Sequence, residues 1–211
     1  MTKAQRAALS PADVVDAAMR LLAEEGLDAV TVRAVADRLG VQMNTVLWHV
    51  KTKKRLLELM ADAVVGTIDH TGLPEAADER AGELIRRYRG ALLAHRDGAA
   101  LVTGTHVPEP HTLRFGEALL AALRESHDDP VAATRIFYAL VYFTLGLTQE
   151  QQTTGDADQD RLARAADPET HPALIASLHT LATDTFDDRF EDGIRRLLAG
   201  SSGKIVGRDS T

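Results

Sequence analysis

Apolar residues recur at helical spacing along most of the chain, and no segment shows the strict alternation of a strand between hairpin turns. The first stripe follows Ser10-Pro11, where the Ser10 side chain can accept a hydrogen bond from a first-turn amide and Pro11 has no amide to satisfy. Gly26 suits the left-handed position that ends a helix. The pattern predicts a helix over about residues 11–25, with an inward stripe of Val14, Val15, Ala18, Leu21 and Leu22.

Two short helices follow. Thr31 is a suitable cap for a helix over residues 32–39, and Gly40 ends it. A third helix is expected over about 42–50, and a longer one over about 53–69 leads away from a basic bend. Val46 and Val50 lie one turn apart and are expected to face inward. The sequence predicts a three-helix unit in residues 1–55 joined to a connecting helix.

A break at residues 71–74, which contains Gly72 and Pro74, is the predicted domain boundary. Residues 70–200 are then expected to form a second, larger helical domain. Its helices are predicted at about 76–96, 98–104, 111–126, 130–152, 172–181 and 183–199. The polar stretch 153–172 is expected to be a long loop, and residues 201–211 a disordered tail. The predicted fold class is therefore all-α with two domains.

Composition limits the classes of function. The 211 residues include no cysteine, which excludes disulfide scaffolds, thiol catalysis and cysteine-ligated zinc. Apolar residues make up 45% and charged residues 26%, values typical of a globular protein. No run approaches 18 apolar residues, and the first residues lack the apolar core of a signal peptide. We therefore expect a cytoplasmic protein that does not bind a membrane.

Charge is spread unevenly. The net charge is −7, yet residues 1–55 hold nine basic and six acidic side chains, a local excess of +3. The rest of the chain holds 15 basic and 25 acidic side chains, an excess of −10. A basic segment can contact phosphates within a Debye length of about 8–10 Å whatever the total charge. The N-terminal segment is thus the part expected to meet nucleic acid.

The two short helices around Gly40-Val41 form a helix-turn-helix pattern. The first helix would brace the second, whose outward side chains would enter the major groove of DNA. The alternative is a helical hairpin inside a core, but a Trp-His pair beside several lysines is a poor core sequence. The candidate base-contacting face is Met43, Asn44, Thr45, Leu47, Trp48 and His49, with Lys51 and Lys53 as candidate phosphate contacts.

The strings TVRAVADRLGV (31–41) and TVLWHVKTK (45–53) resemble the DNA-binding domain of the tetracycline-repressor (TetR) family. The resemblance implies a homodimeric, all-helical transcriptional repressor whose C-terminal domain binds a small molecule and then releases its operator. It places Arg33, Thr45, Trp48, His49 and Lys53 where the family contacts DNA. Met43 and Asn44 stand where the tetracycline repressors have Gln-Pro, and Leu47 stands where they have Tyr. The operator sequence therefore does not carry over from the family.

The resemblance continues more thinly in the strings HRDGA (95–99), GT (104–105), FTLG (143–146) and EQQ (150–152). The tetracycline repressors hold a magnesium–drug chelate through a His for which this chain has Val102. Three other drug contacts are also replaced, by Leu84, His106 and Tyr142. Glu150 remains, but a single carboxylate is a poor magnesium site. We expect no metal, no cofactor and an effector other than magnesium–tetracycline.

A largely apolar pocket with a few hydroxyl and imidazole groups is still expected in the second domain, suited to a small apolar or aromatic ligand. The alternative for each aromatic or aliphatic member is plain core packing. The turn 107–110, which holds two prolines, could transmit ligand binding as a hinge. The candidate ligand residues are Tyr88, Val102, Thr105, His106, Phe115, Leu119, Tyr138, Tyr142 and Glu150.

Residues 131–147 are apolar nearly all round, so this helix must be buried on several sides. The last helix has a narrower apolar stripe that includes Phe190 and Ile194. The pattern alone fits an internal core equally well. The resemblance implies that helices about 130–152 and 183–199 pair with their twins in a four-helix bundle. Such a two-fold dimer requires a palindromic operator.

Two other classes of function compete with a ligand-responsive repressor. An enzyme is disfavoured because the chain has no Gly-x-Ser-x-Gly elbow, phosphate loop, His-Glu-x-x-His or dinucleotide fingerprint. A ligand-sequestering helical module that has lost DNA binding is disfavoured by the complete set of DNA-contact residues. Activation rather than repression of transcription stays open, as do the effector, the operator sequence and the target genes.

Overall fold

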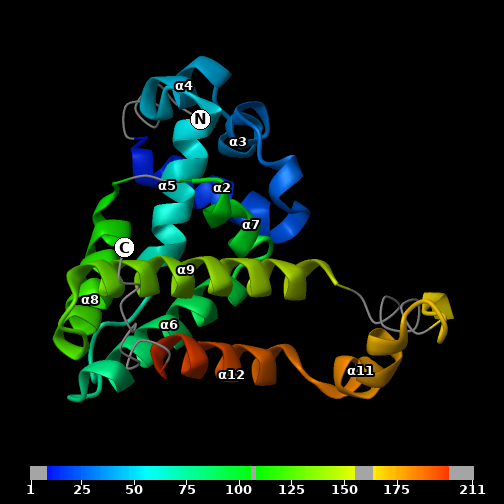
Figure 1. Cartoon of the computed structure of the whole chain (residues 1–211). Coiled ribbons are helices and arrows are strands. Elements are labelled where there is room, and N and C mark those ends of the chain that lie inside the picture. Colours follow the sequence, from blue (N-terminus) through cyan, green and yellow to red (C-terminus); the bar gives the residue numbers. More distant parts are fainter. Residues whose placement is uncertain (1–8, 106–107, 155–163, 200–211) are drawn as a thin grey trace, which may run out of the picture.

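The computed structural model describes residues 9–105, 108–154 and 164–199. This part of the chain is all-helical, with ten α-helices, one 3-10 turn and no strand, which confirms the predicted fold class (Figure 1). The helices are α2 (Pro11–Glu25), α3 (Val32–Leu39), α4 (Met43–Val50), α5 (Lys53–Gly66), α6 (Ala77–Leu93), α7 (Gly98–Thr103), α8 (Pro110–Ser126), α9 (Pro130–Thr153), α11 (Pro172–Thr183) and α12 (Phe186–Ala199). The short 3-10 turn η1 is Leu27–Ala29.

The first helices begin and end at the predicted capping residues. The Asp13 amide donates to Ser10 Oγ over 3.2 Å, and the Ser10 amide donates to Asp13 Oδ2 over 2.8 Å, a capping box. The Ala34 amide donates to Thr31 Oγ1 over 3.1 Å at the start of α3. Gly40 ends α3 in the left-handed conformation, with φ of 65°. Local chemistry thus fixes the start of α2 and both ends of α3.

A small apolar core holds α2, α3 and α4 together. Val14, Leu22, Val35, Val46 and Val50 are all essentially without solvent exposure. Val46 and Val50 face inward as predicted, so the opposite side of α4 is left on the surface. Helix α5 begins three residues after α4 ends and packs against α2, α6, α7 and α8. It runs from the three-helix unit into the body of the molecule (Figure 1).

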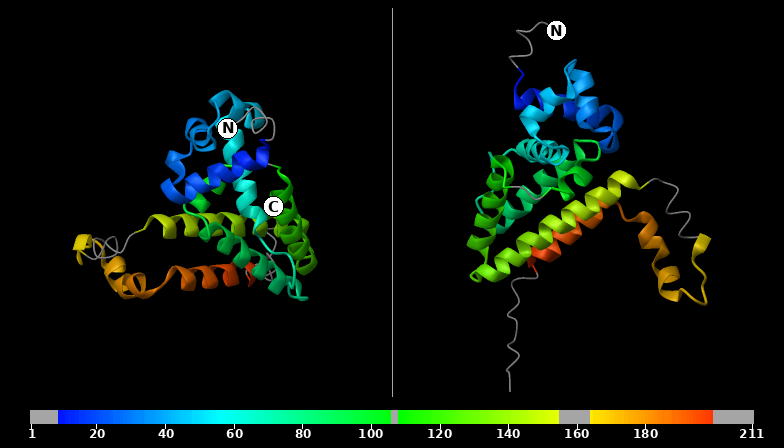
Figure 2. Two further views of the ribbon diagram at one scale, coloured as in Figure 1. Left: turned by 180° about the vertical axis from the view of Figure 1, so that it is seen from behind. Right: turned by 90° about the horizontal axis from the view of Figure 1, so that it is seen from above.

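The second part of the chain is built on α6, α8, α9 and α12; α6 and α9 pack against each other and both contact α8 and α12, and the buried apolar residues continue the core of the first helices. Gly193 lets α12 approach α9 closely, because a Cβ at this position would lie 2.2 Å from Phe143 Cζ. Helix α9 lies along α12, and α8 covers one end of α9 (Figure 2). The outer side of α9 still exposes Val131, Tyr138 and Tyr142.

Helix α11 differs from all the other α-helices that the structure describes, because none of its residues is buried. It projects away from the body of the molecule in every view (Figures 1 and 2). Leu174, Ile175 and Leu178 are half-exposed, and Leu181 is 37% exposed. An apolar helix without a buried side within its own chain leaves surface available for contact with another molecule.

Helix α9 is long and apolar enough to cross a membrane by length and composition alone. A single helix of this kind is weak evidence for a membrane span. Four other helices, α6, α7, α8 and α12, pack against α9, as expected for a core helix.

The observed helices follow the predicted ones to within three residues at each end. The predicted loop 153–172 lies partly outside the described residues, since 155–163 are not described; within the rest, residues 164–165 are helical and 168–170 form a turn. The predicted tail 201–211 also lies outside the described residues. The last helix starts at Phe186 because Thr185 Oγ1 accepts a hydrogen bond from the Asp188 amide over 3.0 Å and caps it.

Candidate DNA-binding surface and ligand cavity

The outer side of α4 carries the predicted base-contacting residues. Trp48 is 71% exposed and Met43 is 47% exposed, both high values for large apolar side chains. Asn44 is exposed, and Thr45, Leu47 and His49 are half-buried at the edges of the same face. A large aromatic ring that the fold leaves in solvent is available for contact with another molecule.

The Trp48 ring is held in place by its neighbours. The His49 ring meets it edge-on, with 5.1 Å between the ring centroids and 86° between the planes. Lys51 Nζ lies 5.4 Å from the Trp48 ring centroid and donates a hydrogen bond to the Trp48 carbonyl over 2.8 Å. Lys51 adopts φ of 63° as the residue that ends α4. The end of the helix thereby presents an aromatic ring and a cation side by side.

The start of α5 adds positive charge beside this surface. Lys53 and Lys54 are exposed, and Thr52 Oγ1 accepts a hydrogen bond from the Arg55 amide over 3.0 Å. Arg33 is exposed on the neighbouring α3. Helix N-termini and lysines both favour phosphate groups. The predicted base-contacting and phosphate-contacting residues therefore share one end of the molecule.

A cavity of about 260 Å³ lies in the second part of the chain, between α5, α6, α8, α9 and the end of α7. Six of the predicted ligand residues line it: Tyr88, Val102, Thr105, Phe115, Tyr138 and Tyr142. Sequence reasoning missed eight further lining residues: Glu58, Ala61, Val65, Thr112, Gly116, Phe137, Val141 and Leu145. The α5 members had no sequence signal, because which side of α5 faces the cavity depends on packing with distant helices.

Tyr88 is the most buried polar side chain of the cavity, with 3% of its surface exposed. Its ring stacks on Phe115, with 4.7 Å between centroids and 22° between planes. Burial raises the pKa of the Tyr88 hydroxyl, so the group stays protonated. Within the part of the chain that the structure describes, this hydroxyl makes no hydrogen bond.

Tyr138 and Tyr142 form the more open side of the cavity. They lie one turn apart on α9, are 50% and 56% exposed, and stack with 5.6 Å between ring centroids. Phe137 contacts Tyr138 edge-on at 5.4 Å. Apolar rings therefore continue from the buried floor of the cavity to the molecular surface.

Two of the predicted ligand residues lie outside the cavity lining. Leu119 is completely buried and does not line the cavity, because it lies one turn beyond Phe115 in the core that α8 forms with its neighbours. Glu150 also does not line it, since it is exposed on α9 more than a turn past Leu145. His106 lies outside the described residues.

The residues present do not fit a magnesium site. Magnesium requires several oxygen ligands in octahedral geometry. Among the described residues, no group of three His, Cys, Asp or Glu side chains is placed to hold a metal ion. The cavity is lined by one carboxylate, Glu58, while Glu150 points to solvent and Val102 offers no ligand atom.

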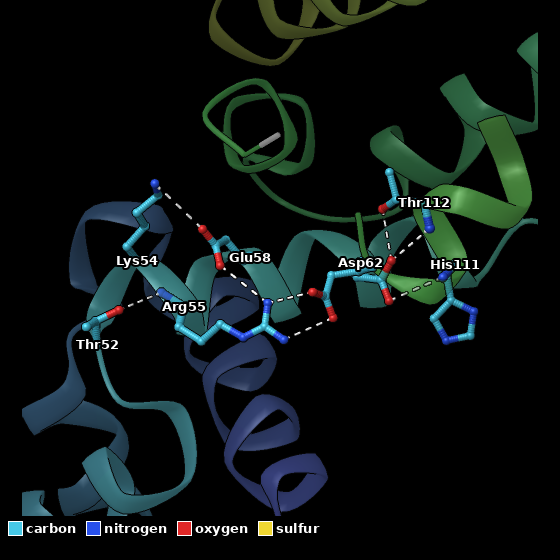
Figure 3. Close-up of polar contacts among 8 residues, drawn as sticks. Thr52, Lys54, Arg55, Glu58, Asp62, His111 and Thr112 are labelled. Atoms are coloured by element: carbon cyan, nitrogen blue, oxygen red, sulfur yellow. Dashed lines mark hydrogen bonds and ion pairs between the residues drawn. The ribbon is translucent and has the colours of Figure 1, made fainter. Parts of the chain in front are cut away.

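Polar contacts join α5 to the start of α8 beside the cavity (Figure 3). Arg55 donates to both oxygens of Glu109, over 2.6 and 3.1 Å, and to Glu58 over 3.3 Å. This arginine holds the pKa of the Glu109 carboxyl below its ordinary value. The buried Asp62 accepts hydrogen bonds from the Thr112 amide and hydroxyl over 2.8 and 2.9 Å. Asp62 thus caps the start of α8.

A second set of contacts joins the three-helix unit to the start of α7. The Leu27 amide donates to Asp97 Oδ2 over 2.8 Å, and Arg96 donates to the Glu24 carbonyl over 2.9 Å. Asp97 has φ of 54°, a conformation that turns the chain sharply before α7. The three-helix unit is therefore attached to the second part of the chain through α5 and through this turn.

Comparison with known proteins gives the same assignment for both halves. Residues 14–60 match the profile of "Bacterial regulatory proteins, tetR family", and residues 71–204 match "Tetracyclin repressor-like, C-terminal domain". The chain is 34% identical over 200 residues to the class A tetracycline repressor protein from transposon 1721 of Escherichia coli, covering 91% of this chain and 90% of that protein.

Two solved structures from Streptomyces coelicolor are also similar. One is described as a possible TetR family transcriptional regulator; it is 38% identical, covers 90% of this chain and 98% of its own, and has a TM-score of 0.81. The other is ActR in complex with actinorhodin, at 25% identity and a TM-score of 0.83, covering 92% of this chain and 97% of its own. Both align over nearly the whole chain, so the shared likeness includes both halves.

Proposed function

This chain belongs to the TetR family of transcriptional regulators, which bind DNA rather than catalyse reactions, and from that premise we propose how it works. It is a transcriptional repressor with a ligand-binding C-terminal domain. We propose that it binds a palindromic operator as a homodimer and releases it when a small apolar or aromatic molecule enters the cavity. Such a regulator acts in the cytoplasm, where its operator lies.

The DNA-binding assignment is supported by the surface of α4. Its inner side is fixed by Val46 and Val50, so its outer side can enter the major groove without disturbing the core. Asn44 and Thr45 near the start of α4 are proposed to read base edges, together with Met43, Leu47, Trp48 and His49. Arg33, Lys51 and Lys53 are proposed to contact phosphates.

The homodimer is supported by surfaces that a single chain leaves open. Tyr138 and Tyr142 on α9 are exposed, and none of the residues of α11 is buried, so apolar surface is available for a second chain. Pairing α9 and α12 with their twins would cover part of it. A two-fold dimer presents two copies of α4, so its operator must be palindromic, with half-sites about one helical turn apart or more.

Helix α5 is the single observation that carries the regulatory part of the proposal. Its first residue follows the DNA-binding helix α4 by three positions, and Glu58, Ala61 and Val65 on the same helix line the cavity. A ligand that pushes on α5 therefore acts on an element attached directly to α4. The polar contacts of Arg55 and Asp62 with the start of α8 hold α5 in a defined position, which a bound ligand can change.

In thermodynamic terms the ligand binds better to the arrangement in which the two α4 helices are wrongly spaced for the operator. Ligand binding shifts the population toward that arrangement. By linkage, operator binding must lower ligand affinity by the same factor by which the ligand lowers operator affinity.

The test is fluorescence anisotropy of a labelled palindromic operator with the full chain, titrated with a panel of aromatic compounds. The proposal expects at least one compound that binds the protein to release the operator, and to bind more weakly when operator is present. Compounds that bind in the cavity without changing operator affinity would contradict the proposed regulation. Chemical turnover of a bound compound would instead favour an enzyme.

A further inference from the structure

The cavity is unusual in its mixture of aromatic rings and charge. The chain has nine aromatic residues, one Trp, three Tyr and five Phe, and five of them line this cavity, including all three tyrosines. Among the described lining residues no side chain carries a positive charge, and Glu58 is the one that carries a negative charge at neutral pH. Within the described lining, a ligand therefore meets ring faces, aliphatic side chains, two threonines and one carboxylate.

The Glu58 carboxylate keeps capacity for another hydrogen bond. It accepts from Arg55 over 3.3 Å, while Arg55 directs its two shorter bonds, of 2.6 and 3.1 Å, to Glu109 (Figure 3). Lys54 Nζ lies 3.8 Å away on a side chain that is 84% exposed, an arrangement that contributes little. A carboxylate offers about four lone-pair positions, so Glu58 has acceptor sites left.

The aromatic lining favours the same kind of ligand. Ring faces carry partial negative charge and attract cations within about 6 Å of the ring centroid. Among the described lining residues, an anion would find no cation to offset these rings and the Glu58 carboxylate. Burying a charged group without a partner is costly, so the cavity disfavours carboxylates and phosphates.

We infer that the effector is an aromatic amine, bound with its protonated nitrogen at the Glu58 carboxylate and its ring among the aromatic side chains that include Tyr88 and Phe115. The inference rests on the proposed function and names the chemical class of the effector. The buried Tyr88 hydroxyl, which lacks a hydrogen-bond partner in the described part of the chain, is available to a polar atom on the ring.

This placement also explains why ligand charge would matter for release. An ammonium group on Glu58 would share this carboxylate with Arg55, which donates to it over 3.3 Å. Arg55 is the residue that ties α5 to Glu109 at the start of α8. The positive charge of the ligand would thus act beside the contact that holds α5 against the start of α8.

Three probes that share one ring test the inference: naphthalen-2-ylmethylammonium, naphthalen-2-ylmethanol and 2-naphthoate. Their affinities for the full-length protein are measured by isothermal titration calorimetry at neutral pH. The ammonium compound is expected to bind roughly 10- to 100-fold more tightly than the alcohol, because a hydrogen bond to a charged group is worth about 1.5–3 kcal/mol. The naphthoate is expected to bind most weakly.

The variant Glu58→Gln keeps the shape of the side chain and removes its charge. It should bring the ammonium compound to within about twofold of the alcohol, while the affinity for the alcohol stays unchanged and thereby reports that the fold is intact. The matched control is Glu117→Gln, an exposed residue of α8 outside the cavity, which should keep the full preference for the ammonium compound.

The inference is overturned if the ammonium compound fails to bind, if the alcohol or the naphthoate binds as tightly, or if the preference survives in Glu58→Gln. None of these results decides the proposed function. That proposal fails separately, if no compound that enters the cavity changes operator affinity; a neutral or anionic compound that releases the operator would leave it standing while refuting the aromatic amine.

Discussion

The DNA-binding surface and the ligand cavity are built in opposite ways. All six base-contacting candidates lie within seven consecutive positions of one helix, and the helix that braces it is capped by Thr31 at its start and ended by Gly40. The cavity collects side chains from Glu58 to Leu145, carried by five helices and by Thr105 just after α7. The comparison teaches that the first site depends on local sequence and the second on long-range packing, so they should respond differently to substitution.

The largest expected effect comes from Val46→Asp, which tests whether the DNA-binding surface can be disrupted while the ligand cavity stays intact. Val46 is fully buried beneath α4, and an unpaired carboxylate there costs several kcal/mol, about enough to unfold the three-helix unit locally. Operator affinity should fall by about a thousandfold or more. Binding of the naphthylmethylammonium probe, measured by calorimetry, should change by less than about twofold. Loss of probe binding as well would show that the cavity depends on the helix-turn-helix.

The converse experiment is Gly116→Trp. Gly116 lines the cavity, and a Cβ there would meet only Phe137, at 3.9 Å, so a larger side chain can extend into the empty volume. Probe affinity should fall about a hundredfold, equal to roughly 2.7 kcal/mol, while operator affinity stays unchanged. Gly90→Trp is the control, since Gly90 is exposed on α6 with open space around it. Unchanged probe binding in Gly116→Trp would place the ligand elsewhere.

These two variants also mark what the sequence could and could not predict. The helices of the DNA-binding half follow from residues that act on their own neighbours, such as Ser10, Thr31 and Gly40, and the outward side of α4 follows from the inward Val46 and Val50. Each signal spans five residues or fewer.

The residues that line the cavity have no such short-range sequence signals. Tyr88, Phe115 and Tyr142 were predicted from a family resemblance and their residue types, whereas Glu58 was missed because an acidic residue on a connecting helix is normally a solvated one. Leu119 has the helical spacing of a lining residue relative to Phe115, yet the turn that carries it packs into the core. Only the packing of α5, α8 and α9 distinguishes these cases.

Asn44→Ala and Thr45→Ala test whether α4 reads bases. Each should change the preferred base at one operator position by about 1–3 kcal/mol and leave binding to other sequences nearly unaltered. Competition experiments with operators that differ at single positions measure this. An equal loss of affinity on every sequence would assign these side chains to the backbone or to stability.

Arg55→Gln tests the link between the two sites. Removing the two bonds to Glu109 should leave operator affinity and probe affinity within a few-fold of the original values. Ligand weakens operator binding by a certain factor, and in Arg55→Gln this factor should be about three- to tenfold smaller. The coupling free energy of such regulators is of order 1–3 kcal/mol. Titration of operator complexes with ligand measures that factor. If ligand weakens operator binding as much in the variant as in the original chain, the Arg55–Glu109 pair takes no part in the coupling.

The same pair predicts a pH dependence. Arg55 lowers the pKa of the Glu109 carboxyl in the folded protein. The stabilisation from this pair is therefore complete above the ordinary carboxyl pKa of about 4.3–4.5 and is lost as pH falls through the lower folded-state value. Thermal unfolding followed by circular dichroism below pH 4.5 should show a shallower acid loss in Glu109→Gln than in the original chain. Parallel curves would mean that the pair adds nothing to stability.

The smallest expected effect is that of Lys53→Ala, which sharpens the description of the DNA surface. Loss of one phosphate contact should weaken binding to all DNA sequences alike and reduce the slope of log K against log salt by about one unit. Arg124→Ala, an exposed cation on α8, should leave the slope unchanged. An unaltered slope in Lys53→Ala would exclude a phosphate contact at this residue.

The most direct test of the central claim is fluorescence anisotropy of the full chain on palindromic duplexes from the DNA that flanks its own gene, with random DNA alongside, at two salt concentrations. We predict tight binding to one palindrome at two chains per duplex, a steep loss of affinity at the higher salt, and much weaker binding to random DNA. Equal affinity for all duplexes at both salt concentrations would contradict the assignment of α4 as an operator-reading helix.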